Sequence, residues 1–243
     1  MLIVGKQERL IMIYLLIVYL WFFSQLIPGP ILRHDELIPQ FRQLRNFIFS
    51  QKNMALGLSL FSLGLCKKVL IADTISPWVA LGFNNAEDLS FIEAWVGALS
   101  YAFQLYFDFS GYSDIAIGSA RLLGFNLMKN FAFPYFSRDI AEFWRRWHIS
   151  LSTWFRDYVY IPLGGSRVNN YLKVRNVFAI FLISGFWHGA NWTFIFWGFL
   201  NALYFIPLIL SKKNRSNLDV IANGKLIPNF NEFVMMLFTF ILV

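Results

Sequence analysis

The sequence has little charge and almost no cysteine. Asp, Glu, Lys and Arg make up only 14% of its 243 residues, whereas 57% are hydrophobic and 19% aromatic. Soluble domains rarely combine so little charge with so much apolar side chain, which argues against a soluble fold. Cys66 is the only cysteine, so an intramolecular disulfide is excluded, and no Cys and His cluster has the spacing of a metal site.

Two common catalytic patterns are also missing. The sequence contains no glycine-rich motif for nucleotide phosphates and no serine-centred nucleophile turn. Its net charge of +7 could indicate nucleic acid as a partner, but the basic residues lie between apolar runs. Because cytoplasmic loops of membrane proteins collect Lys and Arg, we interpret this charge as a signal of membrane topology and expect no nucleic-acid partner.

Long apolar segments are abundant. A helix needs about 20 apolar residues to cross a bilayer. Four regions are placed in lipid on this basis, namely 10–27, 54–72, 91–118 and 177–210, and a fifth begins at Phe233, 11 residues from the end. The first could be a secretory signal peptide, but it is not followed by a small-x-small cleavage pattern, so we expect a retained helix.

The segments between the apolar regions differ in charge. Residues 29–52 carry four basic residues, whereas 73–90 carry three acidic residues and no Lys or Arg. Residues 121–175 hold nine basic residues against three acidic ones, and 211–225 are again basic. The positive-inside rule therefore places 73–90 outside and the other three segments in the cytoplasm. Both ends of 177–210 then face the cytoplasm, which requires that region to be a hairpin of two short helices.

The stretch 138–161 is too charged to cross lipid alone. Its aromatic residues nevertheless recur at helical spacing, which predicts one amphipathic helix at the membrane interface. His148 falls on the aromatic face and is expected to point into protein or lipid. An interfacial histidine among tryptophans is also ordinary belt composition, so a structural role is the alternative. Residues from Pro162 to Gly165 should end the helix in a turn.

His188 lies inside the longest apolar region, in the sequence SGFWHGANW. Ionisable groups within a membrane are candidates for function, and imidazole is the usual general base for an alcohol that attacks an acyl carbon. Gly185 and Gly189 remove bulk so that backbone or a ligand can approach. Ser184 and Asn191 lie one helical turn away as candidate orienting partners. The alternative is that His188 bonds a carbonyl and holds two short helices together.

A third polar cluster lies in the apolar region that follows residue 90. Asp108 and Asp114 need partners or water there, and Arg121 or the arginines of 138–158 could supply them. We therefore favour a salt bridge between packed helices. The functional alternative is a polar wall of a substrate tunnel, which would include Tyr112.

Four stretches together resemble the membrane-bound O-acyltransferase family, in particular its bacterial branch that is similar to the membrane protein of alginate O-acetylation. They follow family order over most of the chain and are FFSQLIPGPILRHDELIPQ (22–40), QLYFDFSGYSDIAIGSARLLGF (104–125), FWRRWHISLSTWFRDYVYIPLGG (143–165) and GFWHGANWTFIFWG (185–198). Family members are usually longer, with further helices on both sides. The resemblance therefore implies that 1–243 is a single but incomplete family domain.

This resemblance implies an all-α, polytopic transmembrane protein with short or re-entrant helices and an interfacial amphipathic helix. It implies transfer of an acyl group, acetyl in this branch, from a cytoplasmic thioester donor to hydroxyls of an exported or cell-wall polysaccharide. His188, in the Trp-His-Gly motif, and His148, in the Arg-Trp-His motif, match the functional histidines of the family. The residues expected to line the substrate-binding region or tunnel are Asp108, Tyr112, Asp114, Trp187, Asn191 and Arg156.

No bound cofactor or metal is expected, and the donor is acetyl coenzyme A or an acyl carrier. The implied location is the inner (cytoplasmic) membrane, in several passes, with an extracytoplasmic acyltransferase as partner protein. A rival is the D-alanyl-transferring branch of the same superfamily, which uses a carrier protein, although the turn at 160–165 looks more like the polysaccharide-acetylating branch. A transporter or a non-catalytic scaffold would be a different class. Transport accumulates a substrate unchanged, whereas acyl transfer consumes a thioester.

Overall fold

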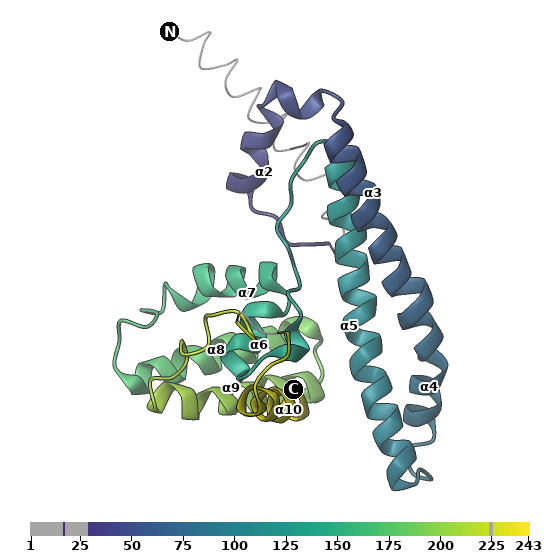
Figure 1. Cartoon of the computed structure of the whole chain (residues 1–243). Helices are drawn as coiled ribbons and strands as arrows, with labels where there is room; N and C mark the ends of the chain where they lie inside the picture. Colours follow the sequence, from purple (N-terminus) through teal and green to yellow (C-terminus); the bar gives the residue numbers. More distant parts are fainter. Residues whose placement is uncertain (1–16, 18–28, 224–225) are drawn as a thin grey trace. The chain divides into compact units, whose positions relative to one another are not determined.

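The computed structural model describes residues 17, 29–223 and 226–243, drawn in colour in Figure 1. The chain divides into two compact units, Met1–Lys129 and Asn130–Val243. Every regular element among the described residues is a helix, which confirms the all-α class. Apart from Ile17, the helix predicted over 10–27 lies outside the described residues.

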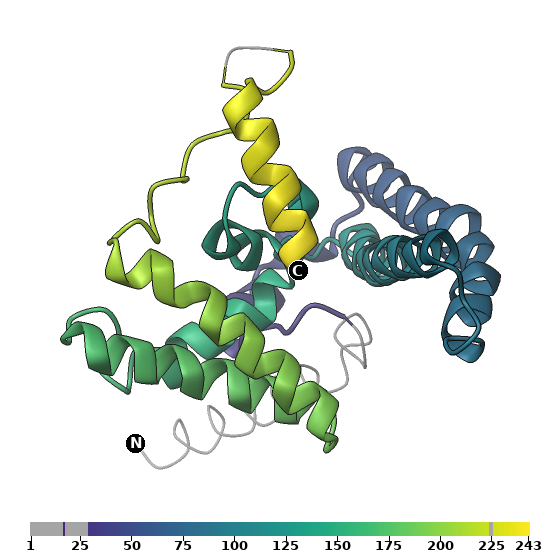
Figure 2. The ribbon, with the colours of Figure 1, turned by 90° about the horizontal axis from the view of Figure 1, so that it is seen from below.

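The first unit is built around a pair of long helical segments. α3 (Gln51–Leu65), a π-helical segment (Cys66–Ala72) and α4 (Asp73–Asn84) follow one another without interruption and form one rod of 34 residues. This rod packs along α5 (Phe91–Leu122), as Figures 1 and 2 show. The apolar regions predicted over 54–72 and 91–118 are therefore both helical.

The loop predicted over 73–90 is wrong in its extent. Helix α4 continues to Asn84, and only 85–90 connects it to α5. The reason lies in Lys68, whose ammonium is 2.9 Å from the Asp73 carboxylate. A carboxylate that is paired within a helix no longer marks a loop, so the charge pattern placed the boundary too early.

Glycines bring α3 and α5 close together. Gly57 and Gly64 of α3 meet Gly118 and Gly111 of α5, and a Cβ added to Gly64 would lie 2.5 Å from the Gly111 carbonyl oxygen. No larger side chain fits at that distance unless a helix moves. Small residues at such contacts are typical of helices that pack inside membranes.

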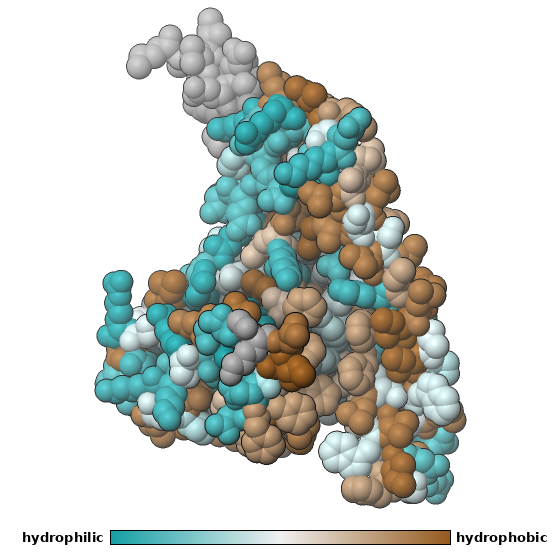
Figure 3. Space-filling model, viewed as in Figure 1, coloured by the Kyte–Doolittle hydropathy of each residue, from teal (hydrophilic) through white to brown (hydrophobic). Residues whose placement is uncertain are grey.

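The outer surface of this helix pair is apolar. Figure 3 shows hydrophobic side chains along it, and the large exposed ones include Leu58, Leu63, Leu70, Leu81 and Phe83. Two described helices, Gln51–Asn84 and Trp192–Leu210, are long and apolar enough to cross a bilayer by length and composition. These features agree with an all-α membrane protein.

A small core joins the residues before α3 to those after α5. Helix α2 (His34–Phe41) and a 3₁₀ turn (Leu44–Phe47) precede α3. The side chain of Gln40 donates a hydrogen bond to the Asn126 carbonyl at 2.9 Å and accepts one from the Asn126 N–H at 2.8 Å. The apolar side chains of this core are Leu32, Leu37, Ala120, Phe125 and Leu127.

The second unit contains two short helices, a helical hairpin and a final helix. After a 3₁₀ turn (Pro134–Phe136), these are α6 (Ile140–Arg146), α7 (Ile149–Phe155), α8 (Asn170–His188), α9 (Trp192–Leu210) and α10 (Phe230–Leu242). Helices α8 and α9 pack against each other around Val177, Phe181, Ala202 and Ile209. The predicted hairpin is therefore confirmed, although α8 begins in the segment that was expected to be a loop.

The amphipathic helix predicted over 138–161 is wrong as a single helix. Between α6 and α7, His148 takes left-handed φ and ψ of 42° and 57°. Two main-chain hydrogen bonds of 2.9 Å hold this break, one from Ala132 N–H to the Arg146 oxygen and one from Ile149 N–H to the Asn130 oxygen. Both halves keep their aromatic residues at helical spacing, so periodicity could not reveal a break that distant residues impose.

The turn predicted after this stretch is present. α7 continues into a π-helical segment (Arg156–Tyr160), and the chain then turns. Gly164 and Gly165 have φ of 99° and 57°, a region that favours glycine because a Cβ would clash there. The side chain of Asn169 accepts the Leu172 N–H at 2.9 Å and starts α8.

Candidate functional site

His148 lies at the break between α6 and α7 and is buried. Only 5% of the residue is exposed, and its ring stacks on Phe131 with centroids 6.4 Å apart. Nδ1 lies 3.3 Å from the side-chain oxygen of Asn130 and 3.4 Å from the Ser150 hydroxyl oxygen. The prediction that this side chain points inward is correct, but His148 lies at the interruption between two helices and not on the face of a continuous helix.

Asn130 gathers the hydrogen bonds around His148. Its side-chain oxygen accepts the Ser150 N–H at 3.2 Å and the Ser150 O–H at 2.9 Å, and its main-chain oxygen accepts the Ile149 N–H. Asn130 and Ser150 are each only 1% exposed. Sequence reasoning missed Asn130, because it precedes His148 by 18 residues and no motif or regular spacing links the two.

His148 is held in its neutral form. Burial lowers its pKa to about 4, because a charged ring would lose its hydration, and the charge of His188 adds a smaller effect in the same direction. At neutral pH the imidazole is therefore uncharged. Both histidines belong to the second unit, and Trp197, on which His188 stacks, contacts Trp144 of the helix that precedes His148.

His188 is the last residue of α8, and it is exposed within the chain. Its ring stacks on Trp197 of α9, with centroids 5.3 Å apart, and contacts Trp187 at 5.0 Å. Within the described residues its imidazole makes no hydrogen bond to a carbonyl. The ring is thus oriented by aromatic neighbours in a residue that is exposed within the chain.

The polar and glycine neighbours of His188 do something other than expected. The Asn191 side chain accepts the Thr193 N–H at 3.1 Å and caps α9, so it does not orient the histidine. A Cβ on Gly185 or Gly189 would collide with Phe194, with its main chain in the first case and its ring in the second. These glycines therefore let the two arms of the hairpin meet. Trp187 is 58% exposed and remains a candidate substrate contact.

Trp144 of α6 reaches the same aromatic cluster. Its ring lies 5.7 Å from Trp197 and 5.2 Å from Phe181. Its indole N–H is buried and has no hydrogen-bond partner among the described residues. A buried donor without a partner costs about 1–3 kcal/mol, and it marks a place where a ligand oxygen could be bound.

Replacement of Trp144 by phenylalanine tests this donor. Trp144→Phe keeps an aromatic ring but removes the unpaired N–H, so we expect a melting temperature equal to or above that of the parent. If the protein transfers acyl groups, as its sequence resemblance implies, the rate of transfer should fall by about tenfold or more, since a hydrogen bond to the substrate is worth about 1.5 kcal/mol. Thermal unfolding in detergent and ester formation in membranes measure the two effects. Unchanged ester formation would assign Trp144 to packing alone.

The carboxylates of the first unit form salt bridges between packed helices. Asp114 lies 2.6 Å from the Lys67 ammonium, and Asp108 lies 2.6 Å from that of Lys68. The salt-bridge interpretation is therefore right, but the partners within this unit are lysines and not Arg121. Arg121 instead donates to the Asn126 side chain at 3.1 Å. Both lysines lie in the π-helical segment.

Two other candidate tunnel residues lie at exposed positions of their own units. Tyr112 of α5 is 40% exposed. Arg156 makes hydrogen bonds of 2.6 and 3.0 Å with the carboxylate of its neighbour Asp157. Asp108, Tyr112 and Asp114 belong to the first unit, whereas both histidines belong to the second.

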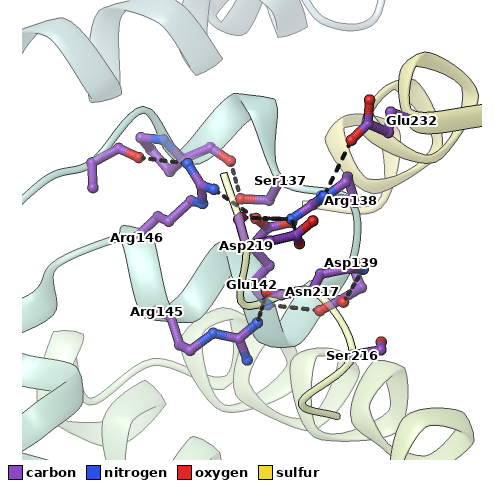
Figure 4. A network of polar contacts seen from close by, with 12 residues as sticks. Ser137, Arg138, Asp139, Glu142, Arg145, Arg146, Ser216, Asn217, Asp219 and Glu232 are labelled. Carbon is purple, nitrogen blue, oxygen red and sulfur yellow. Dashed lines mark hydrogen bonds and ion pairs between the residues drawn. The ribbon is translucent and has the colours of Figure 1, made fainter. Parts of the chain in front are cut away.

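An ion network connects α6 and the residue before it, Asp139, to the part of the chain that follows α9 (Figure 4). The Arg138 guanidinium, 3% exposed in its side chain, pairs with Glu142, Asp219 and Glu232 at 3.0–3.2 Å, and Arg146 reaches Glu142 at 2.6 Å. Burial alone would raise the pKa of Glu142, but hydrogen bonds from the two arginines outweigh it and lower the pKa below its ordinary value. The network fixes the helix that leads into His148.

A cavity of about 400 Å³ opens beside this network. It is mostly apolar with two charged groups, and its lining consists of Phe133, Phe136, Arg146, Leu218, Asp219, Val220 and Ile221. A volume of this size is within the range of small-molecule pockets. In the described part of the chain, no three His, Cys, Asp or Glu side chains gather closely enough to hold a metal ion.

Comparison with known proteins decides the family. The model of the membrane-bound O-acyltransferase family matches residues 11–242. The chain belongs to the membrane-bound O-acyltransferase family. Its resemblance to that family, seen in four stretches of sequence, is therefore confirmed over nearly the whole chain.

Several curated proteins are similar in sequence to this membrane-bound O-acyltransferase chain. The peptidoglycan O-acetyltransferase of Helicobacter pylori is 53% identical over 75% of the chain, and the probable alginate O-acetylase of Azotobacter vinelandii is 51% identical over 72%. The chain spans 34% of the length of each of these two relatives. The teichoic acid D-alanyltransferase of Bacillus subtilis is 26% identical over 82% of the chain and 52% of its own length.

Proposed function

We propose that this membrane-bound O-acyltransferase moves an acetyl group from a thioester donor to hydroxyls of an exported or cell-wall polysaccharide. The observation that carries the proposal is that one unit holds both histidines, a buried neutral one immediately before α7 and an exposed one at the end of α8. Similarity to proteins named as acetylases of alginate and peptidoglycan supports this acyl group and this class of acceptor.

His188 acts as the general base in this proposal. Its ring accepts the proton of an acceptor hydroxyl, and the freed oxygen bonds to the acyl carbon of the thioester. The carbon–sulfur bond then breaks, and the leaving thiolate takes up the proton. The accessible ring suits a base that must meet a large, incoming acceptor.

His148 acts on the donor side. Because its ring is neutral, it can accept or donate one hydrogen bond, which lets it position the thioester or pass the proton toward the leaving sulfur. Trp144 contacts Trp197, on which His188 stacks, and offers its indole N–H to the acyl oxygen. Asp108, Tyr112, Asp114, Trp187 and Arg156 stay candidates for contacts with the acceptor or the tunnel.

The proposed location is the inner (cytoplasmic) membrane, which the chain crosses several times. The basic segments 121–175 and 211–225 lie on the cytoplasmic side, where acetyl coenzyme A or an acyl carrier is available. The cavity beside Arg146 lies in these segments and could receive part of the donor. An extracytoplasmic acyltransferase is the proposed partner that passes the acyl group to the polymer.

A second candidate within the family is transfer of D-alanine from a carrier protein. The similarity to a teichoic acid D-alanyltransferase over 82% of the chain favours it, though at half the identity of the acetylating relatives. Both candidates use the same two histidines and the same bond changes. They differ in the acyl group and in the donor.

Radiolabelled donors distinguish these functions. Membranes that contain the protein are given coenzyme A thioesters of labelled acetate, or labelled D-alanine with its charged carrier, and label in alkali-labile ester is counted. We expect acetate to appear in ester and coenzyme A to be released in equal amount. D-alanyl ester would select the second candidate. Accumulation of an unmodified solute would indicate transport, and no label in any form would leave a scaffold.

A further inference from the structure

Asn130 contacts His148 with more precision than a packing residue requires. It is fully buried, and its two oxygens accept three hydrogen bonds from the consecutive residues Ile149 and Ser150. Its side-chain oxygen also faces the ring nitrogen of His148. These contacts involve main-chain N–H groups, a hydroxyl and an imidazole. The donor or acceptor role of each group therefore restricts the roles that the others can take.

The orientation of the Asn130 amide follows from its neighbours. A main-chain N–H can only donate, and that of Ser150 lies 3.2 Å from one terminal atom of the Asn130 side chain. This atom must therefore be the oxygen and not the nitrogen of the amide. The Ser150 hydroxyl, at 2.9 Å from the same atom, donates to it as well.

The tautomer of His148 follows in turn. An amide oxygen can only accept, so its contact of 3.3 Å with Nδ1 of His148 is a hydrogen bond only when Nδ1 carries the proton of the neutral ring. The basic lone pair of the imidazole then belongs to Nε2. We propose that Asn130 is a positioning residue of the acyl-transfer site, which fixes His148 as the Nδ1–H tautomer so that Nε2 is the nitrogen that handles substrate or proton. This inference rests on the proposed function of His148.

The same residue also caps α7, which is the purely structural alternative. Because the helix begins at a left-handed residue whose side chain does not cap it, Asn130 supplies acceptors for the N–H groups of Ile149 and Ser150. Capping needs only these acceptors, which aspartate supplies equally well. Control of the tautomer and charge of the ring needs a neutral acceptor.

The charged surroundings of His148 make this neutrality matter. His188 of α8 is the titratable group whose charge acts on the ring, and it disfavours protonation. On the preceding helix, Arg145 donates to main-chain carbonyls after α9, and Arg146 donates to Glu142 and to the Ala132 carbonyl. A carboxylate in place of the Asn130 amide would therefore be a new anion directly against the ring.

Asn130→Asp separates the two roles. The capping acceptors stay, but the carboxylate should raise the pKa of His148 by about 1–3 units, so that the ring becomes charged as the pH falls toward about 6. Thiol release from acetyl coenzyme A is measured in membranes between about pH 5 and about pH 9. The parent should keep its activity at about pH 6, whereas the variant should lose about tenfold there and recover at high pH.

Three variants calibrate this result. Asn176→Asp alters another fully buried amide of the same unit, which contacts Arg175 and the Leu163 carbonyl, and it should change abundance without moving the pH profile. Ser150→Ala removes one donor to the Asn130 oxygen and should leave the profile in place. Asn130→Ala should lower the rate at every pH. A profile of Asn130→Asp that superimposes on the parent's at equal abundance overturns the inference.

A spectroscopic measurement tests the tautomer without any enzymatic assay. In the chain labelled with ¹⁵N-histidine, the buried ring should show a protonated, pyrrole-type Nδ1 and an unprotonated, pyridine-type Nε2, and His148→Asn identifies its signals. The reverse assignment contradicts the inference, even if acyl transfer is real. Parent membranes that release no thiol contradict the proposed function instead, and the tautomer still decides the inference.

Discussion

Cells whose chromosomal copy carries His188→Ala are expected to lose about 100-fold or more of the acyl ester on their polysaccharide, because removal of a general base typically costs at least that factor. The substitution should leave the fold intact. His188 is exposed at a helix end, and its ring contacts the aromatic side chains of Trp187 and Trp197. The measurement is acetate released by alkali from purified polysaccharide, with the membrane abundance of the protein determined alongside.

His34→Ala is the matched control for this experiment. His34 is also an exposed histidine at a helix end, but it starts α2 in the first unit. Its loss should not change ester content. If His188→Ala kept the ester of the parent at equal abundance, the histidine would be a packing residue, and transport or scaffolding would become the better interpretation.

Arg138→Met is expected to produce the largest loss of stability. The guanidinium is 3% exposed and faces three carboxylates, one of them the buried Glu142. Removal of one partner from a buried ion pair costs about 3–5 kcal/mol, because the remaining charge is left without compensation. Thermal unfolding in detergent, followed by helix content, should therefore show a lower transition temperature or no folded protein.

Arg156→Met provides the comparison for a surface pair. Arg156 is 58% exposed in its side chain and pairs with the adjacent Asp157, so its loss should change the unfolding free energy by less than about 1 kcal/mol.

The pH dependence of the unfolding free energy of the parent protein is a second test of the network. Because the pKa of Glu142 is lowered in the folded chain, the network stabilises fully above the ordinary carboxyl value of 4.5 and weakens as the pH falls below it. Equal losses in both variants would contradict the network's importance.

Composition and apolar length predicted the helical class, which follows from the cost of placing polar groups in lipid. The charge of the segments on both sides predicted the hairpin of α8 and α9. The boundary at residue 73 could not be predicted in this way. It depends on Lys68, which pairs Asp73 inside the helix, and that pairing is a contact and not a composition. The break at His148 likewise depends on Asn130 and Ala132, which lie far from it in sequence.

The candidate site divides in the same manner. His148 and His188 were found because each carries an unusual polar group in an apolar or aromatic stretch, which a single sequence displays. Their proximity needed the packing of α6 against the hairpin. Asn130 and the indole N–H of Trp144 were not found, because an asparagine in an irregular segment and a tryptophan on an aromatic face have no distinctive pattern. Only a hydrogen bond made, or one missing, distinguishes them.

The ion network has a further consequence for the segment between α9 and α10. Its basic residues make it look like an open target for trypsin, which needs an extended, mobile stretch of chain to bind. Yet Arg145 holds the carbonyls of Asn214 and Asn217, and Arg138 holds that of Asp219. Cleavage therefore requires these hydrogen bonds to break, so the rate of cleavage in this segment reports how often it separates from α6.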